Sequence, residues 1–353
     1  MPRAAITGWG RYVPPAVLTN HELATVVDTS HEWIVTRSGI EERRVSHVSN
    51  ADMATAAGSE ALAAAGVDPS ELDHVIVATC TADRQIPAMA CYVQTRLGAL
   101  RAAAVDINAG CSGFLYGLDL ADGLIAAGRA ARILVVGSEK ITPYIDLEER
   151  TTAVLFGDAA GAVVVEPATG DEGILSINVG ANGALADALT AEGAGTEFIG
   201  DDARLRIVMD GREVFRNAVS QMPQAALLAI KEAGLQVDDV DLVIPHQANQ
   251  RIIDAVAKRL ELPAERVYSN IARYGNTSAA SIPVALAEAV ELGRVHPGDE
   301  LVFAAFGAGF TWGAAAVRWG PRVEPVATSD LAYPPPDRSA LELLVDLHRR
   351  ERG

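Results

Sequence analysis

The chain of 353 residues is 49% hydrophobic and only 21% charged, so it can bury a large core and has room for two domains or a duplicated one. With 29 Lys and Arg against 46 Asp and Glu, its formal net charge is −17, which argues against a nucleic-acid or anionic-membrane surface. Its three cysteines, Cys80, Cys91 and Cys111, form neither a disulfide framework nor a metal-ligand spacing. We expect a cytoplasmic globular protein in which an acidic ligand would need a local basic patch.

The stretch HEWIVTRSGI places Trp33 and Arg37 four residues apart, so they share one face of a predicted helix. A flat aromatic ring beside a guanidinium suits a nucleotide, because the ring can stack on a base while the arginine pairs with phosphate. The same spacing fits an aromatic anchor beside a surface ion pair. Both interpretations stay open at this point.

Cys111 stands where an apolar, strand-like run (102–107) ends in the small residues AGCSGF and a helix-like run follows. N–H groups at a helix start are unpaired and carry about half a positive charge, so they favour a thiolate and can bind an oxyanion. Gly110 and Gly113 remove side-chain bulk, which lets a substrate carbonyl reach the sulfur. The pattern is typical of a nucleophile, although a lone cysteine at such a turn is usually a packing residue.

Two segments, AGVDPSELDHVIVAT from Ala65 and AGLQVDDVDLVIPHQ from Ala233, repeat one pattern at a constant offset. Strands that alternate with helices predict parallel-type sheets, whose ligand sites lie beyond the carboxyl ends of the strands. The strand-end loops of this duplicated α/β unit carry Cys111, His246 and Asn276.

His246 follows a predicted strand in VDLVIPHQANQRI, and Asn276 precedes a predicted helix in ARYGNTSAASIPVAL. Taken singly, each is usually structural: a core histidine, or an asparagine of a turn or cap. Together with Cys111 they form a set that can do chemistry, and we interpret them as one catalytic constellation. A hydrolytic cysteine triad uses the same residue types, so a hydrolase is an alternative.

The chain resembles the β-ketoacyl-acyl carrier protein synthase III enzymes of the thiolase superfamily. The motifs WIVTRSGI, AGCSGF, MDGREVF, PHQANQRI, GNTSAASIP and FGAGFTWG occur in the family's order before Trp319. The resemblance implies a five-layered α-β-α-β-α fold from two similar halves, 1–170 and 171–320, and usually a homodimer. Residues 321–353 exceed the usual family end, and we expect an extended, proline-rich segment and then a short helix.

The resemblance also implies the reaction, a decarboxylative condensation of an acyl-CoA primer with malonyl-acyl carrier protein that initiates fatty acid synthesis. Cys111 would hold the acyl group, His246 and Asn276 would stabilise the enolate, and the backbone N–H groups of Cys111 and Ala308 would bind the oxyanion. Neither a metal nor a redox cofactor is implied. A priming ketosynthase or acyltransferase of a polyketide or specialised pathway, or a type III polyketide synthase, is the alternative.

Further residues match the family's binding positions. CoA would contact Trp33, Arg37, Arg150, Arg212, Phe215 and Asn249, and the acyl carrier protein would dock on Gln247, Ala248, Asn249, Gln250 and Arg251. Ile86 falls where acetyl-using relatives commonly place an aromatic residue that reaches across the dimer into the acyl pocket. We therefore expect Ile86 to shape this pocket and branched or longer primers to be tolerated.

Overall fold

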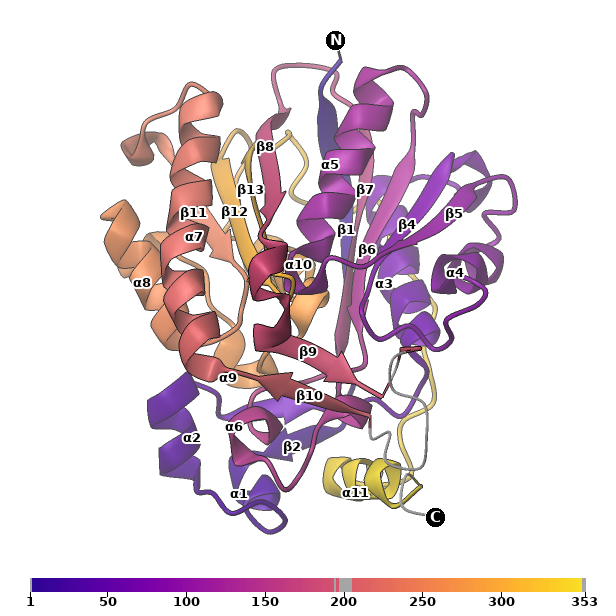
Figure 1. The fold of residues 1–353 in the computed structure, drawn as a ribbon. Helices are drawn as coiled ribbons and strands as arrows, with labels where there is room; N and C mark the ends of the chain where they lie inside the picture. The colour runs from indigo at the N-terminus through magenta and orange to yellow at the C-terminus, as the bar shows by residue number, and fades with distance from the viewer. Residues whose placement is uncertain (1, 194, 197–204, 351–353) are drawn as a thin grey trace.

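The computed structural model describes residues 2–193, 195–196 and 205–350, and it contains two central sheets (Figure 1). The first sheet has five strands in the order β1-β7-β6-β4-β5, and the second has four in the order β11-β12-β13-β8. The bounds of the first are β1 (Ala4–Tyr12), β4 (His74–Ala78), β5 (Ala103–Ile107), β6 (Ile133–Glu139) and β7 (Ala159–Pro167). Those of the second are β8 (Gly173–Ala181), β11 (Leu242–Pro245), β12 (Glu300–Gly307) and β13 (Thr311–Arg318).

Helices lie between the two sheets and on both outer faces. Helices α5 (Gly113–Ala126) and α10 (Ser281–Glu291) share one apolar core with both sheets. The outer face of the first sheet packs on α3 (Asn50–Ala65) and α4 (Met89–Leu97), and that of the second on α7 (Gly211–Glu232) and α8 (Gln250–Leu260). The layers therefore run α-β-α-β-α, and the predicted fold class is confirmed.

The two halves repeat the same strand pairing. In the first sheet β4 pairs in parallel with β6 through His74 and Ile133. In the second sheet β11 pairs in parallel with β12 through Leu242 and Leu301, which are the counterparts of His74 and Ile133 in the sequence repeat. Helices α5 and α10 begin at positions related by the same offset, Gly113 and Ser281. The offset read from the sequence is thus a true structural register.

The helices differ in how they are capped. A side chain accepts a hydrogen bond from a first-turn N–H in α2 (His31–Ser38), α3, α7 and α8, where the caps are Ser30, Ser49, Asp210 and Asn249. Helices α5 and α10 have no side-chain cap. Helices α4 and α9 (Ile271–Tyr274) lack one too, but α5 and α10 are the two that lie between the sheets, with their N-termini next to the loops of Cys111 and Asn276.

Shorter elements cover the ends of the sheets that carry the site (Figure 1). They are β2 (Val17–Thr19), α1 (Asn20–Leu23), β3 (Glu42–Arg44), α6 (Arg150–Ala153), β9 (Leu189–Glu192), β10 (Arg206–Met209) and α9 (Ile271–Tyr274). Strands β9 and β10 form a separate antiparallel pair. One side of the cavity described below is therefore built from loops and short strands rather than from the main sheets.

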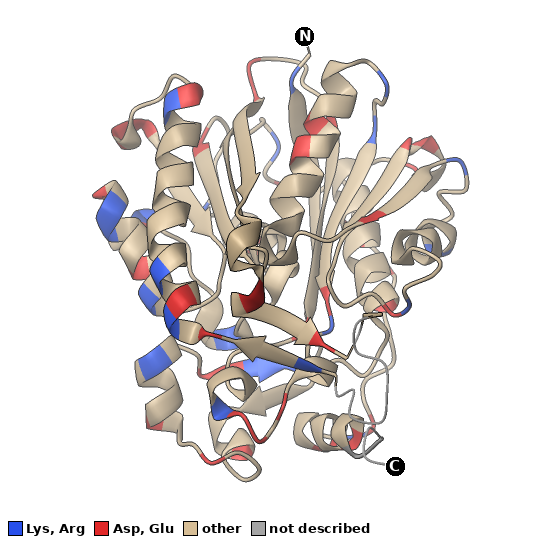
Figure 2. Ribbon diagram, in the orientation of Figure 1, with Lys and Arg blue, Asp and Glu red and all other residues tan. Residues whose placement is uncertain are grey.

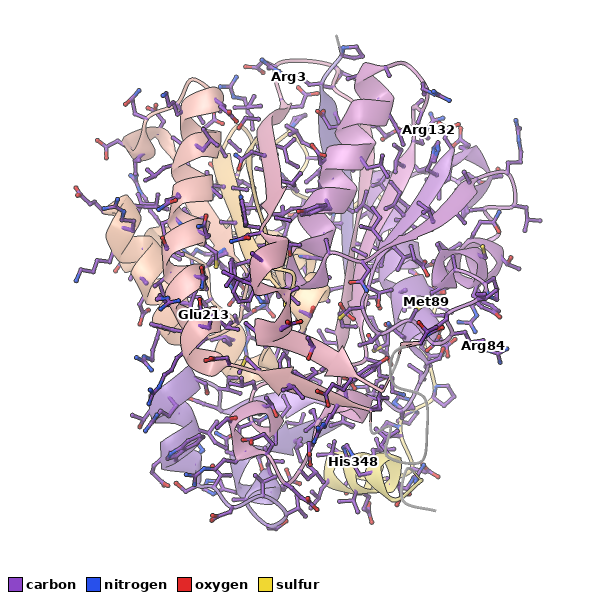
Figure 3. The ribbon with its side chains drawn as sticks, viewed as in Figure 1. Arg3, Arg84, Met89, Arg132, Glu213 and His348 are labelled. Atoms are coloured by element: carbon purple, nitrogen blue, oxygen red, sulfur yellow. The ribbon has the colours of Figure 1, made fainter. Side chains whose placement is uncertain are left out.

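The C-terminal extension docks on the body of the protein. Its backbone follows α3, where Val326 N and Ala327 N each donate a hydrogen bond of 3.1 Å to α3 carbonyl groups. It ends in α11 (Ala340–Arg350), the predicted short helix, which carries His348 (Figure 3). Helix α11 buries Leu343 and Leu344 in an apolar cluster with the 141–145 segment. The extension is therefore packed against the outside of the protein by both backbone hydrogen bonds and apolar contacts.

Candidate active site

Cys111 lies in a single 3-10 turn between β5 and α5, as the sequence predicts. Close backbone packing fixes this turn. A Cβ on Gly307 would lie 2.6 Å from Cys111 N, and a Cβ on Gly110 would lie 3.0 Å from Ala308 N. Only glycine permits this approach, and Gly110 also has a positive φ of 54°. The N–H groups of Cys111 and Ala308, predicted to bind an oxyanion, therefore belong to two loops in direct contact.

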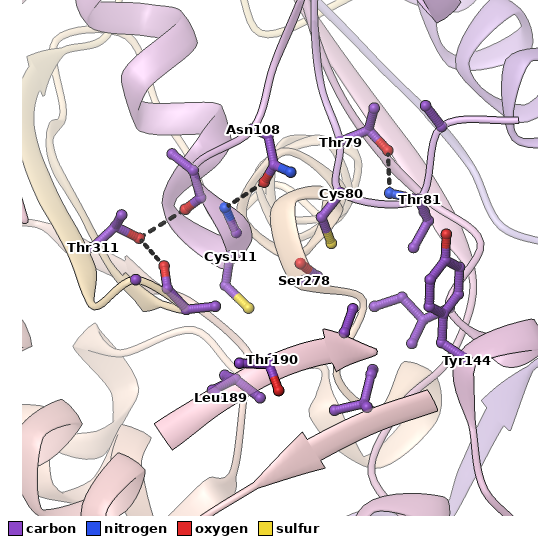
Figure 4. A pocket seen from close by; sticks show the side chains of 18 of the residues that line it. Thr79, Cys80, Thr81, Asn108, Cys111, Tyr144, Leu189, Thr190, Ser278 and Thr311 are labelled. Atoms are coloured by element: carbon purple, nitrogen blue, oxygen red, sulfur yellow. Dashed lines mark hydrogen bonds between the residues drawn. The ribbon is translucent and has the colours of Figure 1, made fainter. Parts of the chain in front are cut away.

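Thr311 fastens these two loops together. Its hydroxyl lies 2.7 Å from the carbonyl oxygen of Ala109 and 3.1 Å from that of Ala308 (Figure 4). One hydroxyl at the start of β13 thus joins the loop before Cys111 to the loop after β12. This arrangement holds the backbone amides on both loops in a fixed relation, as a preorganised anion site requires.

Two adjoining cavities reach Cys111, with volumes of about 740 and 100 Å³. Cys80, Ser278 and Ala308 also line the larger one (Figure 4). The smaller cavity is lined by Cys111, His246 and Asn276 together. The structure therefore brings to one cavity the three side chains that the sequence singled out, although they come from loops of both halves.

His246 is buried just past β11. Its Nδ1 lies 2.6 Å from the Ser281 hydroxyl at the start of α10. Burial lowers the pKa of His246 to about 3, so the ring is neutral at physiological pH. A neutral ring that accepts the Ser281 proton at Nδ1 carries its own hydrogen on Nε2, where it can donate to a ligand.

Asn276 is held by both its side chain and its backbone. Its Oδ1 accepts a 2.8 Å hydrogen bond from Ser278 N, and its own N donates to the Leu155 carbonyl at 2.8 Å. With Oδ1 engaged, the amide NH₂ is the side-chain group that remains to donate into the cavity. His246 and Asn276 thus both offer N–H donors beside Cys111.

The electrostatics of Cys111 differ from the sequence-based expectation. Burial, with a smaller contribution from the carboxylate of Glu139, raises the pKa of the thiol to about 12. A contact with the Ser278 side chain and the backbone N–H of Cys111 act in the opposite direction, but they are weaker. The expected thiolate is therefore wrong for the resting protein, because the cost of burying a charge exceeds the benefit of the helix start.

The residues expected to contact CoA gather around Trp33 on α2. The guanidinium of Arg37 lies 5.4 Å from the centre of a Trp33 ring, and that of Arg150 lies 5.0 Å away. Asn249 connects this group to α8, since its Nδ2 donates to the Arg37 carbonyl at 3.1 Å while its Oδ1 caps the helix. Asn249 also lines the smaller cavity, so the Trp33 group borders the region that leads to Cys111.

Basic residues gather over α2, α7 and α8 (Figure 2). Phe215 of α7 lines the smaller cavity, and the exposed guanidinium of Arg251 lies 4.9 Å from the centre of its ring. Arg212 is exposed in the first turn of α7, and it is not among the residues that line the two cavities. In an otherwise acidic protein this region is the basic patch that an acidic ligand needs.

The predicted carrier-docking segment is only partly accessible. Gln247 is 1% exposed, and its side chain donates to the Pro245 carbonyl at 2.7 Å and accepts from Asn270 N at 3.0 Å. Gln247 therefore shapes the loop from inside and offers no docking surface. Ala248, Asn249 and Gln250 are half-buried, and Arg251 is exposed.

Ile86 is 85% exposed and is not among the residues that line either cavity. Its neighbours Arg84 and Gln85 do line the larger cavity, and Figure 3 shows Arg84 near the start of α4. Within a single chain Ile86 is therefore no wall of the acyl pocket. It projects from the rim of the cavity into the surroundings.

Sequence reasoning missed Glu139 and Ser278. Glu139 ends β6 and is fully buried next to Cys80, and Ser278 lies between the Cys80 and Cys111 side chains in Figure 4. A carboxylate at the end of the apolar run ILVVGSE was the available signal, because charged residues are rarely buried without a reason. Ser278 had no signal of its own.

Within 2–193, 195–196 and 205–350, no group of three or more His, Cys, Asp or Glu side chains is arranged to hold a metal ion. Among the helices of the same residues, none is long and apolar enough to cross a membrane.

The model of the 3-oxoacyl-[acyl-carrier-protein] synthase III family matches residues 105–183, and the model of its C-terminal region matches residues 230–319. The β-ketoacyl-[acyl-carrier-protein] synthase III 2 of Vibrio cholerae is 46% identical over 97% of this chain and 95% of its own. The crystal structure of the Aquifex aeolicus 3-oxoacyl-[acyl-carrier-protein] synthase III matches with a TM-score of 0.85 and 47% identity, over 90% of this chain and 100% of that chain. The priming β-ketosynthase from the R1128 polyketide pathway matches with a TM-score of 0.87 and 36% identity, over 92% of this chain and 97% of that one. The chain therefore belongs to the 3-oxoacyl-acyl carrier protein synthase III family of condensing enzymes.

Proposed function

We propose that this protein joins an acyl-CoA primer to malonyl-acyl carrier protein, with Cys111 as the nucleophile. In the first half-reaction the Cys111 sulfur attacks the thioester carbonyl, forms a new thioester and releases CoA. The observation that carries the proposal is the convergence of Cys111, His246 and Asn276 on one cavity. No part of the reaction needs a metal or redox group, because thioester exchange and loss of carbon dioxide supply the driving force.

The second half-reaction uses the two N–H donors. As carbon dioxide leaves the malonyl group, negative charge develops on the thioester oxygen, and His246 Nε2 and the Asn276 amide stabilise it. The resulting carbanion attacks the carbonyl carbon of acyl-Cys111. The oxyanion formed there is bound by the N–H groups of Cys111 and Ala308. Its collapse breaks the carbon–sulfur bond to Cys111 and releases 3-oxoacyl-acyl carrier protein, and the Cys111 thiolate takes up a proton from water. The neutral state of His246 favours this donor role over a hydrolase mechanism, in which the histidine must accept a proton.

The basic patch supports binding of both substrates. Trp33 and the arginines beside it, Arg37 and Arg150, suit the adenine and phosphates of CoA. Phe215 and Asn249 border the path to Cys111, and Arg212 lies further out on α7. Arg251 is the exposed cation at the mouth, and an acidic carrier protein would dock there.

The free edge of the first sheet supports a homodimer. Strand β5 is the last strand in the order β1-β7-β6-β4-β5, and Leu100, Val105 and Ile86 are large apolar residues exposed nearby. An exposed apolar edge strand is suited to pairing with a second copy. In such a dimer Ile86 would enter the partner's acyl pocket. An isoleucine there leaves more room than an aromatic ring, which favours branched or longer primers.

Intact-mass spectrometry tests this function. The protein is incubated with acetyl-, isobutyryl- and hexanoyl-CoA, and malonyl-acyl carrier protein is then added. We expect an acyl adduct that is absent in Cys111→Ala and is discharged as a 3-oxoacyl carrier product with carbon dioxide. Discharge as free acid would make the protein a hydrolase, and adducts from acetyl-CoA alone would contradict the role of Ile86. Transfer to a polyketide carrier in preference to a fatty acid carrier would favour a priming ketosynthase.

A further inference from the structure

Attack by Cys111 requires that its S–H proton go elsewhere. His246 is a poor acceptor, because burial lowers its pKa to about 3 and its Nδ1 already faces the Ser281 hydroxyl at 2.6 Å. Release of the proton to water would leave a buried thiolate close to the carboxylate of Glu139, which raises the pKa of the thiol. The reaction therefore calls for a proton acceptor among the groups packed around Cys111.

Glu139 is 0% exposed and is surrounded by neutral donors. Its Oε1 is 3.1 Å from the Ser278 hydroxyl and 3.3 Å from the Cys80 sulfur. Its Oε2 accepts hydrogen bonds from the hydroxyls of Thr79 and Thr81, at 3.2 and 2.5 Å. Among the described residues no Lys or Arg forms an ion pair with Glu139. A buried carboxylate without a cation has an increased affinity for a proton, and burial raises the pKa of Glu139.

Ser278 connects Glu139 to Cys111. Its hydroxyl donates to Glu139 Oε1 at 3.1 Å, and it lies between the Cys80 and Cys111 side chains in the cavity that all three line (Figure 4). Its hydroxyl also acts to lower the pKa of the Cys111 thiol. Its backbone has φ of 49°, which a serine rarely adopts, and its N–H is held by Asn276 Oδ1 at 2.8 Å. The tight turn at the start of the Ser278–Ala280 segment therefore aims one hydroxyl at a thiol and a carboxylate at once.

We propose that Glu139 accepts the proton of Cys111 through the hydroxyl of Ser278. The S–H bond of Cys111 breaks as its proton moves to Ser278 Oγ, and the proton of Ser278 moves to Glu139 Oε1. The new carbon–sulfur bond forms, the bond to the CoA sulfur breaks, and the same path returns a proton to the departing CoA thiolate. Protons and charge balance over the half-reaction. Glu139 acts through Ser278 and does not touch the substrate, and the proposal rests on Cys111 being the acylated residue.

This transfer keeps a single negative charge on the pair of Cys111 and Glu139 during acylation. Before it the charge is on Glu139 and after it the charge is on Cys111, so acylation does not bury two anions side by side. The other titratable groups that face Glu139 are Cys80 and Tyr144. Burial raises the pKa of Tyr144 to about 12 and that of Cys80 well above its usual range, so both remain protonated and do not compete for the role.

The variant Glu139→Gln tests the proposal, because it keeps the size of the side chain and removes the acceptor. We expect acylation of Cys111 from acyl-CoA, followed by intact mass after rapid quenching, to be about 10²-fold slower at pH 7. The rate should then rise about tenfold for each pH unit, since hydroxide must now generate the thiolate. Discharge of preloaded acyl-Cys111 by malonyl-acyl carrier protein should not be slowed, because Cys111 is the leaving group in that step and gives up no proton.

Ser278→Gly provides the second variant, since glycine removes the hydroxyl and tolerates the positive φ. It should slow acylation to a similar extent, and the double variant should be no slower than the slower single variant. Equal or faster acylation in Glu139→Gln would overturn the proposal, because Glu139 would then only repel the thiolate. Equal slowing of both half-reactions at every pH would overturn it too, because it would show that the substitutions only disturb the structure of the site. If the wild-type adduct persists in Cys111→Ala, the proposed function itself fails.

Discussion

Two buried glutamates, Glu139 and Glu288, illustrate how the surroundings of a carboxylate decide its role. Glu288, on α10, is 1% exposed and forms ion pairs with Arg11 and Arg273. It also accepts hydrogen bonds from the hydroxyls of Tyr268 and Tyr274, at 2.7 and 2.6 Å. Glu139 is equally buried, but its partners are hydroxyl, thiol and amide groups.

The two pKa values consequently move in opposite directions. Burial raises the pKa of both groups. In Glu288 the tyrosine hydroxyls and the two arginines outweigh burial, so the net pKa is lowered. In Glu139 the neutral donors do not outweigh it, and the net pKa is raised. A nearby cation thus makes a buried carboxylate a structural anchor, whereas a site without one keeps the carboxylate able to take up a proton.

The largest expected effect is on the structural glutamate. Glu288→Gln removes the charge that two buried tyrosine hydroxyls and two arginines share, although Arg11 keeps its ion pair with Glu291. The loss of these charged hydrogen bonds should lower the free energy of unfolding by about 3 to 5 kcal/mol. Urea denaturation measures this loss. Cys111 acylation per folded molecule should be unchanged, as a matched contrast to Glu139→Gln. A slower acylation with normal stability would show that the two glutamates do not divide their roles in this way.

The next effect tests whether the 141–145 segment, which follows Glu139 in the chain, is stabilised by apolar packing and not by ion pairs. Leu344 of α11 packs in the cluster that contains Ile141 and Ile145, close to the cavity wall. Leu344→Ala should lower the free energy of unfolding by about 3 kcal/mol, through lost transfer energy and the remaining cavity. Leu331→Ala in the same extension is the control, since Leu331 is 42% exposed. Equal effects of the two variants in thermal unfolding would contradict specific docking of α11.

A smaller effect distinguishes the two carboxylates by pH. The side chain of a glutamate in the unfolded protein has a pKa of about 4.3. The raised pKa of Glu139 makes it stabilising below that pH, and the contribution is lost as pH rises through its folded pKa. The lowered pKa of Glu288 makes it stabilising above ~4.3, and the contribution is lost as pH falls through its folded pKa.

Urea titrations at a series of pH values measure this difference. Relative to wild type, Glu139→Gln should gain stability as pH rises, whereas the deficit of Glu288→Gln should shrink as pH falls below ~4.3. If the stability difference from wild type changes with pH in the same direction for both variants, the pKa values of Glu139 and Glu288 are not shifted in opposite directions.

The smallest effect concerns cations that lack a carboxylate. In the described part of the chain neither Arg37 nor Arg150 forms an ion pair, unlike Arg11 and Arg273. Arg37→Ala should therefore raise KM for acyl-CoA about tenfold by loss of a phosphate contact, with little change in kcat. A short acyl thioester without a nucleotide is the control, and Arg37→Ala should not affect it. A change with both substrates would mean that Arg37 is structural.

Much of the site could be predicted because its signals are local. Cys111, His246 and Asn276 each follow or precede a periodic apolar segment, and the constant offset between the two repeats survives as a strand register. Gln247 illustrates what local pattern cannot supply. Its neighbours in the sequence suggest a surface segment, but its side-chain amide forms hydrogen bonds with backbone groups inside the protein. The side chain of Gln247 therefore cannot contact a docked carrier protein.

The sequence by itself determined the family, the duplicated α/β fold and the three chemically competent side chains, since these depend on periodicity and motif order. Only the tertiary structure decided the charge state of the site. Whether Cys111 is a thiol or a thiolate depends on burial and on Glu139, which belongs to a later strand and accepts a hydrogen bond from Ser278 of the other half. A pKa is set by everything within a few ångströms in space, and that neighbourhood is assembled by the fold.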